Sequence, residues 1–343
     1  MKNEQVKLTS GPLLDDKGNL IEAGYHTSLV RTYDRNAIKI KGMRIKEWDY
    51  YFIGNSKFGV AFTVADNSYL WLTSITFFDF VAKTEVTKTD MGWFSLGKIG
   101  FPSDSSVGDV VFSKKDFSFQ FLHENGKRHL IIKHQKMTKN DAIFCDLILE
   151  ETIKDTMVIA TPFMKKKHFY YNQKINLLKA SGSIQFGSKT YEFKDDSYGV
   201  LDWGRGVWTY KNTWYWSSMS GEYQGHKIGF NLGYGFGDNS KASENMLFFD
   251  STTYKLNDVK FNIPMKDRKE DYLSPWTFTS SSNDINLVFT PILDRYSGTN
   301  VILIKSIQHQ VFGKFSGTFV TPDRKIIHFE DMMGFAEKVR NNW

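Results

Sequence analysis

Cysteine is nearly absent from this sequence, since Cys145 is the only one among 343 residues. A single cysteine excludes an internal disulfide and the cysteine pairs of a structural zinc site. The eight histidines are scattered, and none of them forms a His-Glu-x-x-His motif. No metal is therefore predicted. Cys145 sits in an apolar strand pattern and is predicted to be a buried small residue rather than a nucleophile.

Phosphate-binding and acyl-transfer motifs are also missing. The sequence has no phosphate loop of the Walker type, no Gly-x-Gly-x-x-Gly after a strand and no Gly-x-Ser-x-Gly turn. The glycine run at residues 233–237 alternates with aromatic residues and matches none of these motifs. No cofactor is predicted.

Long apolar runs are absent as well, so no transmembrane segment is predicted. The first seven residues, Met1–Lys7, lack the apolar run and the small-residue cleavage site of a signal peptide. Together with the near absence of cysteine, these features favour a cytoplasmic protein.

Charge of one sign is not concentrated along the chain. The net charge of +6 results from 44 basic residues dispersed among 38 acidic ones, so no nucleic-acid partner is expected. The densest basic cluster, Lys165–His168, precedes the aromatic segment Phe169–Tyr171. An ordinary solvated loop is expected there, and contact with phosphates or a transient contact with a membrane interface stays an alternative.

Hydrophobic residues recur with a period of two, and β-branched and aromatic residues are dense between short runs rich in Gly, Asn, Asp and Ser. This pattern predicts a mostly β protein built from antiparallel β-barrels or sandwiches, with few short helices. Helical pieces are expected at residues 22–25 and 334–339. An Asn-Gly pair at residues 125–126, between two alternating runs, predicts a two-residue hairpin loop.

The domain boundary is predicted near residues 180–182. This placement gives an N-terminal β domain of residues 1–180 and a C-terminal β domain of residues 181–343. The C-terminal domain then begins with a short hairpin that leads into the most distinctive segment of the chain. A candidate site would therefore lie beside the junction, and clefts between domains are frequent ligand sites.

The distinctive segment is Asp-Trp-Gly-Arg-Gly at residues 202–206, followed by further indoles and phenols. Large flat side chains offer contact area, and a buried carboxylate or guanidinium needs a partner, so the segment predicts a binding or reaction wall. Asp202 and Arg205 are the candidate catalytic residues. The candidate ligand-binding residues of this segment are Trp203, Trp208, Tyr210, Trp214 and Trp216.

Strand alternation places Asp202 and Arg205 on opposite faces, because their separation is odd, and places Asp202 and Trp208 on the same face. A bulge at Gly204 or Gly206 would instead let the two charged side chains meet as a structural ion pair. Ligand-facing roles for either residue, and plain core packing for the tryptophans, are the alternatives.

A second polar and aromatic cluster occupies residues 46–51, Lys-Glu-Trp-Asp-Tyr-Tyr. Alternation places Trp48 and Tyr50 on one face, where they are further candidate ligand contacts, and Glu47 and Asp49 on the other. A carboxylate pair can serve glycosidases, but neighbours of this spacing are common on strands and nothing indicates a sugar substrate.

Six motifs in this order resemble the bacterial family known as domain of unknown function 2804. They are Ser-Gly-Pro-Leu-Leu-Asp at 10–15, Lys-Glu-Trp-Asp-Tyr-Tyr at 46–51, Val-Ala-Asp-Asn-Ser-Tyr at 64–69, Asp-Trp-Gly-Arg-Gly at 202–206, Gln-Val-Phe-Gly-Lys-Phe-Ser-Gly at 310–317 and Gly-Phe-Ala-Glu at 334–337. More distantly, the glycine-rich hairpin that runs into Asp-Trp-Gly and then Trp-x-Trp is similar to the tandem lipocalin-like proteins that include carotenoid hydratases and tocopherol cyclases. This resemblance implies two lipocalin-like (calycin-like) domains in tandem.

The resemblance also implies a candidate chemistry. In the hydratases the stretch reads Asp-His-Asn-Trp-Gly and its Asp is a proposed acid for protonating an alkene, whereas here Asp202 adjoins Trp203 directly. Such an acid needs a pKa raised by burial, and the neighbouring indoles would stabilise the resulting cation, while a nearby Arg205 would favour the ionised carboxylate.

Two classes of function follow from these features. The favoured prediction is a protein that binds a hydrophobic or amphipathic small molecule, such as a lipid or isoprenoid, in a β-barrel or inter-domain cavity. The alternative is an enzyme that hydrates, cyclises or isomerises such a molecule with Asp202 as the acid. Nothing in the sequence indicates an oligomeric state.

Overall fold

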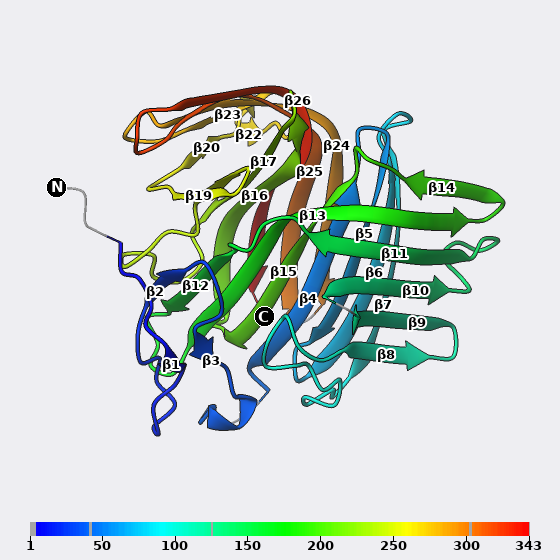
Figure 1. Cartoon of the computed structure of the whole chain (residues 1–343). Coiled ribbons are helices and arrows are strands. Elements are labelled where there is room, and N and C mark those ends of the chain that lie inside the picture. Colours follow the sequence, from blue (N-terminus) through cyan, green and yellow to red (C-terminus); the bar gives the residue numbers. More distant parts are fainter. Residues whose placement is uncertain (1–4, 41–42, 125, 302–303, 343) are drawn as a thin grey trace. The chain divides into compact units, whose positions relative to one another are not determined.

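The computed structural model describes residues 5–40, 43–124, 126–301 and 304–342 (Figure 1). The chain divides into two compact units. The first unit is Lys7–Trp208, and the second is Thr209–Trp343 with the N-terminal Met1–Val6. Both units are built from β-strands, as the period-two pattern predicts.

The described residues of the first unit form fifteen strands and one 3₁₀ turn, η1 (Arg35–Ala37). The strands are β1 (Gly11–Pro12), β2 (Gly24–His26), β3 (Arg31–Thr32), β4 (Ile45–Gly54), β5 (Phe58–Asp66), β6 (Leu70–Asp79), β7 (Thr84–Trp93), β8 (Val110–Lys114), β9 (Phe117–Glu124), β10 (Lys127–His134), β11 (Ile143–Glu151), β12 (Met157–Pro162), β13 (Phe169–Phe186), β14 (Lys189–Phe193) and β15 (Tyr198–Val207).

One large antiparallel sheet organises the first unit. Its strand order is β7-β6-β5-β4-β15-β13-β11-β10-β9-β8. β12 and β14 also pair with β13, and β2 pairs with β12. In Figure 1, β4 to β7 stand next to one another and β8 to β11 form a stack. The separate pair β1 and β3 is parallel.

The predicted boundary near residue 180 falls inside β13, and the two units instead divide between Trp208 and Thr209. β13 is 18 residues long and pairs with β11, β12, β14 and β15. Because β15 then pairs with β4, residues 181–208 complete the first sheet rather than opening a new one. The hairpin predicted to open the second domain is formed by the end of β13 and by β14, and it belongs to this sheet.

Eleven strands occur in the part of the second unit that the structure describes. They are β16 (Lys211–Tyr223), β17 (His226–Tyr234), β18 (Met246–Phe249), β19 (Thr252–Lys255), β20 (Lys260–Asn262), β21 (Met265–Lys266), β22 (Lys269–Glu270), β23 (Trp276–Thr279), β24 (Ile285–Val301), β25 (Ile304–Val320) and β26 (Ile326–Asn342). Nine of them form an antiparallel sheet in the order β19-β18-β17-β16-β26-β25-β24-β23-β20.

Each unit buries its own apolar core on one face of its sheet. In the first unit the core includes Tyr51, Phe62 and Trp203, and in the second it includes Phe230 and Phe315. In the second unit Gly233 packs closely, because a Cβ there would lie 2.8 Å from Glu244 Cδ. Glycine at this position of β17 therefore serves close packing.

Of the local predictions, the hairpin is confirmed and the two helical pieces are wrong. The hairpin at the Asn-Gly pair is confirmed, since Glu124 pairs with Lys127, and Gly126 has a φ of 76°; Asn125 itself lies outside the described residues. The expected helix at residues 334–339 is wrong, because these residues belong to β26, which pairs on both sides with β16 and β25. Residues 22–25 form no helix either, and Gly24 begins β2.

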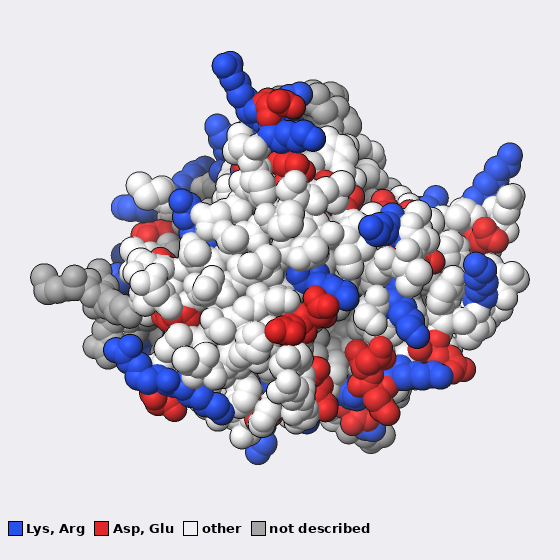
Figure 2. Space-filling model, turned by 90° about the horizontal axis from the view of Figure 1, so that it is seen from above, with Lys and Arg blue, Asp and Glu red and all other residues white. Residues whose placement is uncertain are grey.

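Charged groups are interspersed on the surface, as the sequence predicts. On the face drawn in Figure 2, Lys and Arg alternate with Asp and Glu around broad uncharged areas. Within the described ranges, no helix has the length and apolar character needed to cross a membrane.

Candidate functional site

Strand β15 carries the Asp-Trp-Gly-Arg-Gly motif and lies between β4 and β13. All ten of its residues are buried. The register with both neighbours is continuous from Leu201 to Val207, so no bulge occurs at Gly204 or Gly206. Asp202 and Arg205 therefore point to opposite faces of the sheet and do not pair with each other.

The carboxylate of Asp202 is held by three donors from β4 and β13. Lys174 Nζ forms an ion pair with Asp202 Oδ1 at 2.9 Å, and Asn172 Nδ2 donates to the same oxygen at 2.5 Å. Trp48 Nε1 donates to Asp202 Oδ2 at 3.2 Å. Asn172 is fully buried and also donates to the carbonyl of Trp203. Asp202 thus acts as the acceptor at the centre of a buried polar cluster.

Aromatic rings surround this cluster on the same face of the sheet. The Trp48 ring stacks on Tyr170 at a centroid distance of 6.0 Å and meets Trp208 edge-on at 5.0 Å. Gly204 is paired with Trp48 in the register and provides the space for its indole, since a Cβ at Gly204 would lie 1.9 Å from Trp48 Cζ2. Tyr50, which pairs with Asp202, is buried as well.

Arg205 lies on the opposite face and is completely buried. Its guanidinium lies over the rings of Trp203 and Phe101, with Cζ 4.2 Å and 4.7 Å from their centroids. It forms an ion pair with Asp49 at 3.0 Å and donates to the carbonyls of Trp48, Gly204 and Pro102. These contacts place Arg205 among the side chains of the first unit's core, where it ties β15 to β4.

Glu47 and Asp49 share this inner face, as alternation predicts. Tyr33 Oη donates to Glu47 at 2.8 Å, and Arg35 also pairs with Glu47. Burial raises the pKa of both carboxyls, although the nearby Arg205 acts in the opposite direction on each. The two carboxylates are partners of arginines rather than an open acid and base pair.

The sequence does not single out the partners that complete these clusters. Lys174 and Asn172 form a polar run with Gln173 inside the apolar pattern of β13, and that run is the signal that could have identified them. Arg128 comes from β10 and donates to Ser105 O at 2.7 Å and to Glu151 at 2.9 Å. Arg128 also donates to Tyr51 Oη of β4 at 3.4 Å, and no local sequence pattern indicates this contact.

The remaining predicted tryptophans belong to the second unit, on β16. Trp214 Nε1 donates to Glu337 at 2.8 Å, and Trp216 Nε1 donates to Asn231 at 2.7 Å. Tyr210 precedes β16, and 46% of its surface is exposed. The predicted residues are therefore divided among the two faces of β15 and a separate strand of the second unit.

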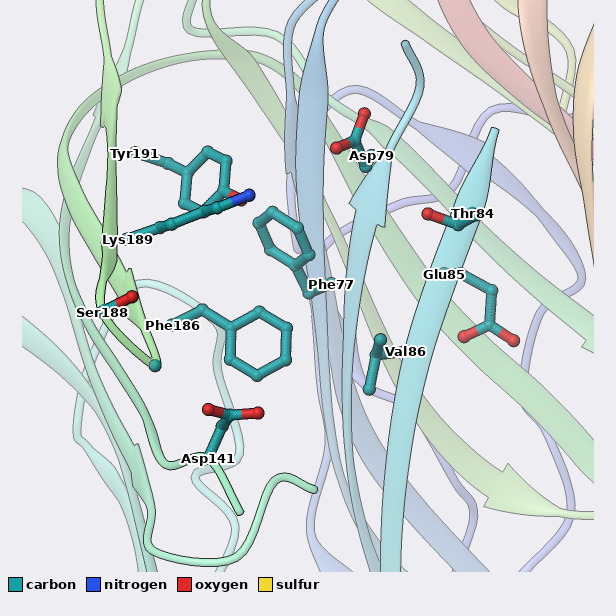
Figure 3. A pocket seen from close by; sticks show the side chains of 11 residues that line it. Phe77, Asp79, Thr84, Glu85, Val86, Asp141, Phe186, Ser188, Lys189 and Tyr191 are labelled. Carbon is teal, nitrogen blue, oxygen red and sulfur yellow. The ribbon is translucent and has the colours of Figure 1, made fainter. Parts of the chain in front are cut away.

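A pocket of about 290 Å³ lies elsewhere in the first unit, between two strand hairpins (Figure 3). The β6–β7 hairpin contributes Phe77 and Val86, and the β13–β14 hairpin contributes Phe186 and Tyr191. The Phe77 ring lies 5.3 Å from Phe186 and 4.7 Å from Tyr191, between centroids. These four side chains form an apolar floor.

Polar groups border the same pocket. Figure 3 shows the carboxylates of Asp79 and Asp141 at opposite ends of the ring cluster, with Lys189 beside Tyr191. Thr84, Glu85 and Ser188 complete the polar border. The sequence-based set of site residues includes none of this lining, because the pocket is assembled from hairpin ends and a loop.

Neither a cluster of metal-ligand side chains nor an exposed thiol occurs in the part of the chain that the structure describes. No group of three or more His, Cys, Asp or Glu side chains there could hold a metal ion. Cys145 is fully buried in the core, and burial raises the pKa of its thiol far above the ordinary value. The prediction of a buried small residue is confirmed at this position.

Two solved structures share this arrangement of strands. A protein of Nitrosomonas europaea, provisionally assigned as an AttH, has a TM-score of 0.51 at 12% identity, over 86% of this chain and 92% of its own. Kievitone hydratase of Nectria haematococca also has a TM-score of 0.51, at 13% identity, over 91% of this chain and 96% of its own. The chain thus has the tandem lipocalin-like fold that the sequence motifs indicated.

The sequence itself shows the family to which the chain belongs. Residues 3–343 match the family described as "Domain of unknown function (DUF2804)", and the chain belongs to this family. No curated protein sequence matches it.

Proposed function

We propose that this protein binds a small hydrophobic or amphipathic molecule, and that the pocket between the β6–β7 and β13–β14 hairpins is the binding site. The observation that carries the proposal is the composition of this pocket, an aromatic floor with a polar border. Ligand sites are typically concave and mostly apolar, with a few polar groups that fix the orientation of the ligand. A volume of about 290 Å³ suits a small molecule.

The lining divides the pocket into two chemically distinct parts. Phe77, Phe186 and Tyr191 offer ring faces and edges to an apolar or flat group. Three carboxylates and one ammonium border this floor and would interact with a polar end of the same ligand; they belong to Asp79, Glu85, Asp141 and Lys189. The two parts together favour an amphipathic molecule over a purely apolar one.

Acid catalysis at Asp202 is the less favoured function. One structural neighbour is named a hydratase, and Asp202 lies beside an indole that could stabilise a cation. A general acid, however, must carry a proton, whereas the carboxylate of Asp202 accepts from Lys174, Asn172 and Trp48. We therefore assign Asp202 and its neighbours a structural role in joining β15 to β4 and β13.

Filling the pocket should abolish binding of an amphipathic probe. In Val86→Trp a large indole replaces a side chain of the floor, so the dissociation constant of anilinonaphthalene sulfonate should rise at least about tenfold. Fluorescence titration of the probe measures this change. The matched control is Val81→Trp, at an exposed position of the same β6–β7 connection that does not line the pocket.

The proposal requires the two variants to differ. If Val86→Trp and Val81→Trp bind the probe equally well, while both have the melting temperature of the unmodified protein, the pocket is not the binding site. A second variant, Phe186→Ala, removes a ring from the floor and so enlarges the pocket. Its affinity for the probe should change, although the probe can still enter.

A further inference from the structure

One end of the large sheet in the first unit brings several loops together. Ile45 at the start of β4 pairs with Val207 at the end of β15, and Val207 pairs with Phe169 at the start of β13. Farther along the same sheet, Leu70 at the start of β6 pairs with Trp93 at the end of β7. The residues just outside these strand ends therefore follow one edge, roughly 25 Å long at the usual strand spacing.

Large apolar side chains are exposed along this edge. Trp93 is 65% exposed and Phe94 57%, at the end of β7 and directly after it, and Leu96 is 51% exposed. Met43, before β4, is 42% exposed, and Met164, in the β12–β13 turn, is 98% exposed. Exposed apolar residues that gather in one region mark an interaction surface rather than ordinary surface variation.

Basic residues adjoin these apolar residues in the sequence. Lys165–Lys167 follow Met164, Arg44 follows Met43, and Lys98 follows Leu96 closely. Among the described ion pairs, none involves any of these five cations. Burial lowers the pKa of His168, and the charges of Lys165 and Arg44 act in the same direction, while the hydrogen bond with the Lys166 carbonyl acts in the opposite one. We call these five cations, together with Met43, Trp93, Phe94, Leu96 and Met164, the basic-aromatic rim.

We infer that the basic-aromatic rim docks on a membrane surface that contains anionic lipids. Exposed Trp and Phe side chains occupy the boundary between lipid headgroups and acyl chains, and Lys and Arg beside them bind the phosphates. Nucleic acid fits less well, because Met43, Leu96 and Met164 offer no ring on which a base could stack. This inference is independent of the pocket, which is formed at the other end of β13, and goes beyond the proposed function.

Vesicle sedimentation of the full chain tests the inference. Vesicles of phosphatidylcholine with phosphatidylglycerol as a minority component should bind the protein, and vesicles of phosphatidylcholine alone should bind it much less. Replacing Lys165–Lys167 by Gln should weaken binding on the order of a hundredfold, because each lysine near an anionic surface contributes independently. Added salt should weaken binding of the unmodified protein as well.

Two further variants keep the result interpretable. The combined variant Lys115→Gln, Lys133→Gln and Lys139→Gln removes the same charge from exposed positions outside the rim and should bind almost normally. Trp93→Phe should still bind, but its tryptophan fluorescence should be quenched less by brominated acyl chains than that of the unmodified protein. Equal binding to both vesicle types, or equal loss in the two charge variants, would overturn the inference, as would binding to RNA without binding to vesicles.

Discussion

Gly204→Ala should lower the free energy of unfolding by about 3 kcal/mol, the upper part of the range for overpacking a buried site. A Cβ at this position would lie 1.9 Å from Trp48 Cζ2, so the indole has to leave its place across β15. Its displacement would also break the hydrogen bond from Trp48 Nε1 to Asp202. Denaturant unfolding followed by circular dichroism measures the change.

A double-mutant cycle identifies the cause of that loss. If the clash with the indole is responsible, Gly204→Ala should cost much less when it is introduced into Trp48→Ala, where the space is vacant. Additive costs in the two backgrounds would show that the backbone of β15, and not the ring of Trp48, makes glycine necessary.

Asp202→Asn should destabilise the protein by about 3 kcal/mol, because it leaves the buried ammonium of Lys174 without its counter-charge. The double variant Asp202→Asn with Lys174→Met removes both charges and should recover much of the loss. Chemical denaturation of the single and double variants at neutral pH provides the comparison.

The acid-catalyst alternative predicts another pattern for the same variants. Asp202→Asn would then leave the free energy of unfolding nearly unchanged, and the double variant would be no more stable than the single one. That result would contradict the structural role assigned to Asp202.

Much of the fold is predictable from local sequence. A period of two specifies strands, and the Asn-Gly pair specifies the β9–β10 hairpin, because both depend on residues close together in the chain. Regular strand alternation places Asp202 and Arg205 on opposite faces, as the register of β15 shows, and the preferred prediction of an ion pair between them is wrong. The bulge that would have paired them does not occur.

The partners of these residues are not predictable in the same way. Lys174 reaches Asp202 through the pairing of β13 with β15, and Asp49 reaches Arg205 from β4, far earlier in the chain. The choice of partner strand is a property of the whole sheet. The domain boundary was misplaced for the same reason, since only the long-range pairing of β15 with β4 assigns residues 181–208 to the first unit.

The pocket is the feature that is least predictable from the sequence. Phe77 and Val86 come from one hairpin and Phe186 and Tyr191 from another, and each of these side chains fits an ordinary strand pattern in the sequence. Only the approach of the two hairpins brings their side chains around one cavity. The indole-rich segment is conspicuous in composition, whereas the described contacts of Asp202 and Arg205 join β15 to β4 and β13.

The most direct test of the proposed function is native mass spectrometry of the full chain, purified from a lipid-rich expression host, beside Val86→Trp and Val81→Trp. We expect the unmodified protein and Val81→Trp to retain a small amphipathic molecule that solvent extraction releases, and Val86→Trp to lack it. The same retained mass in all three proteins, or in none of them, would contradict the assignment of the pocket as the binding site.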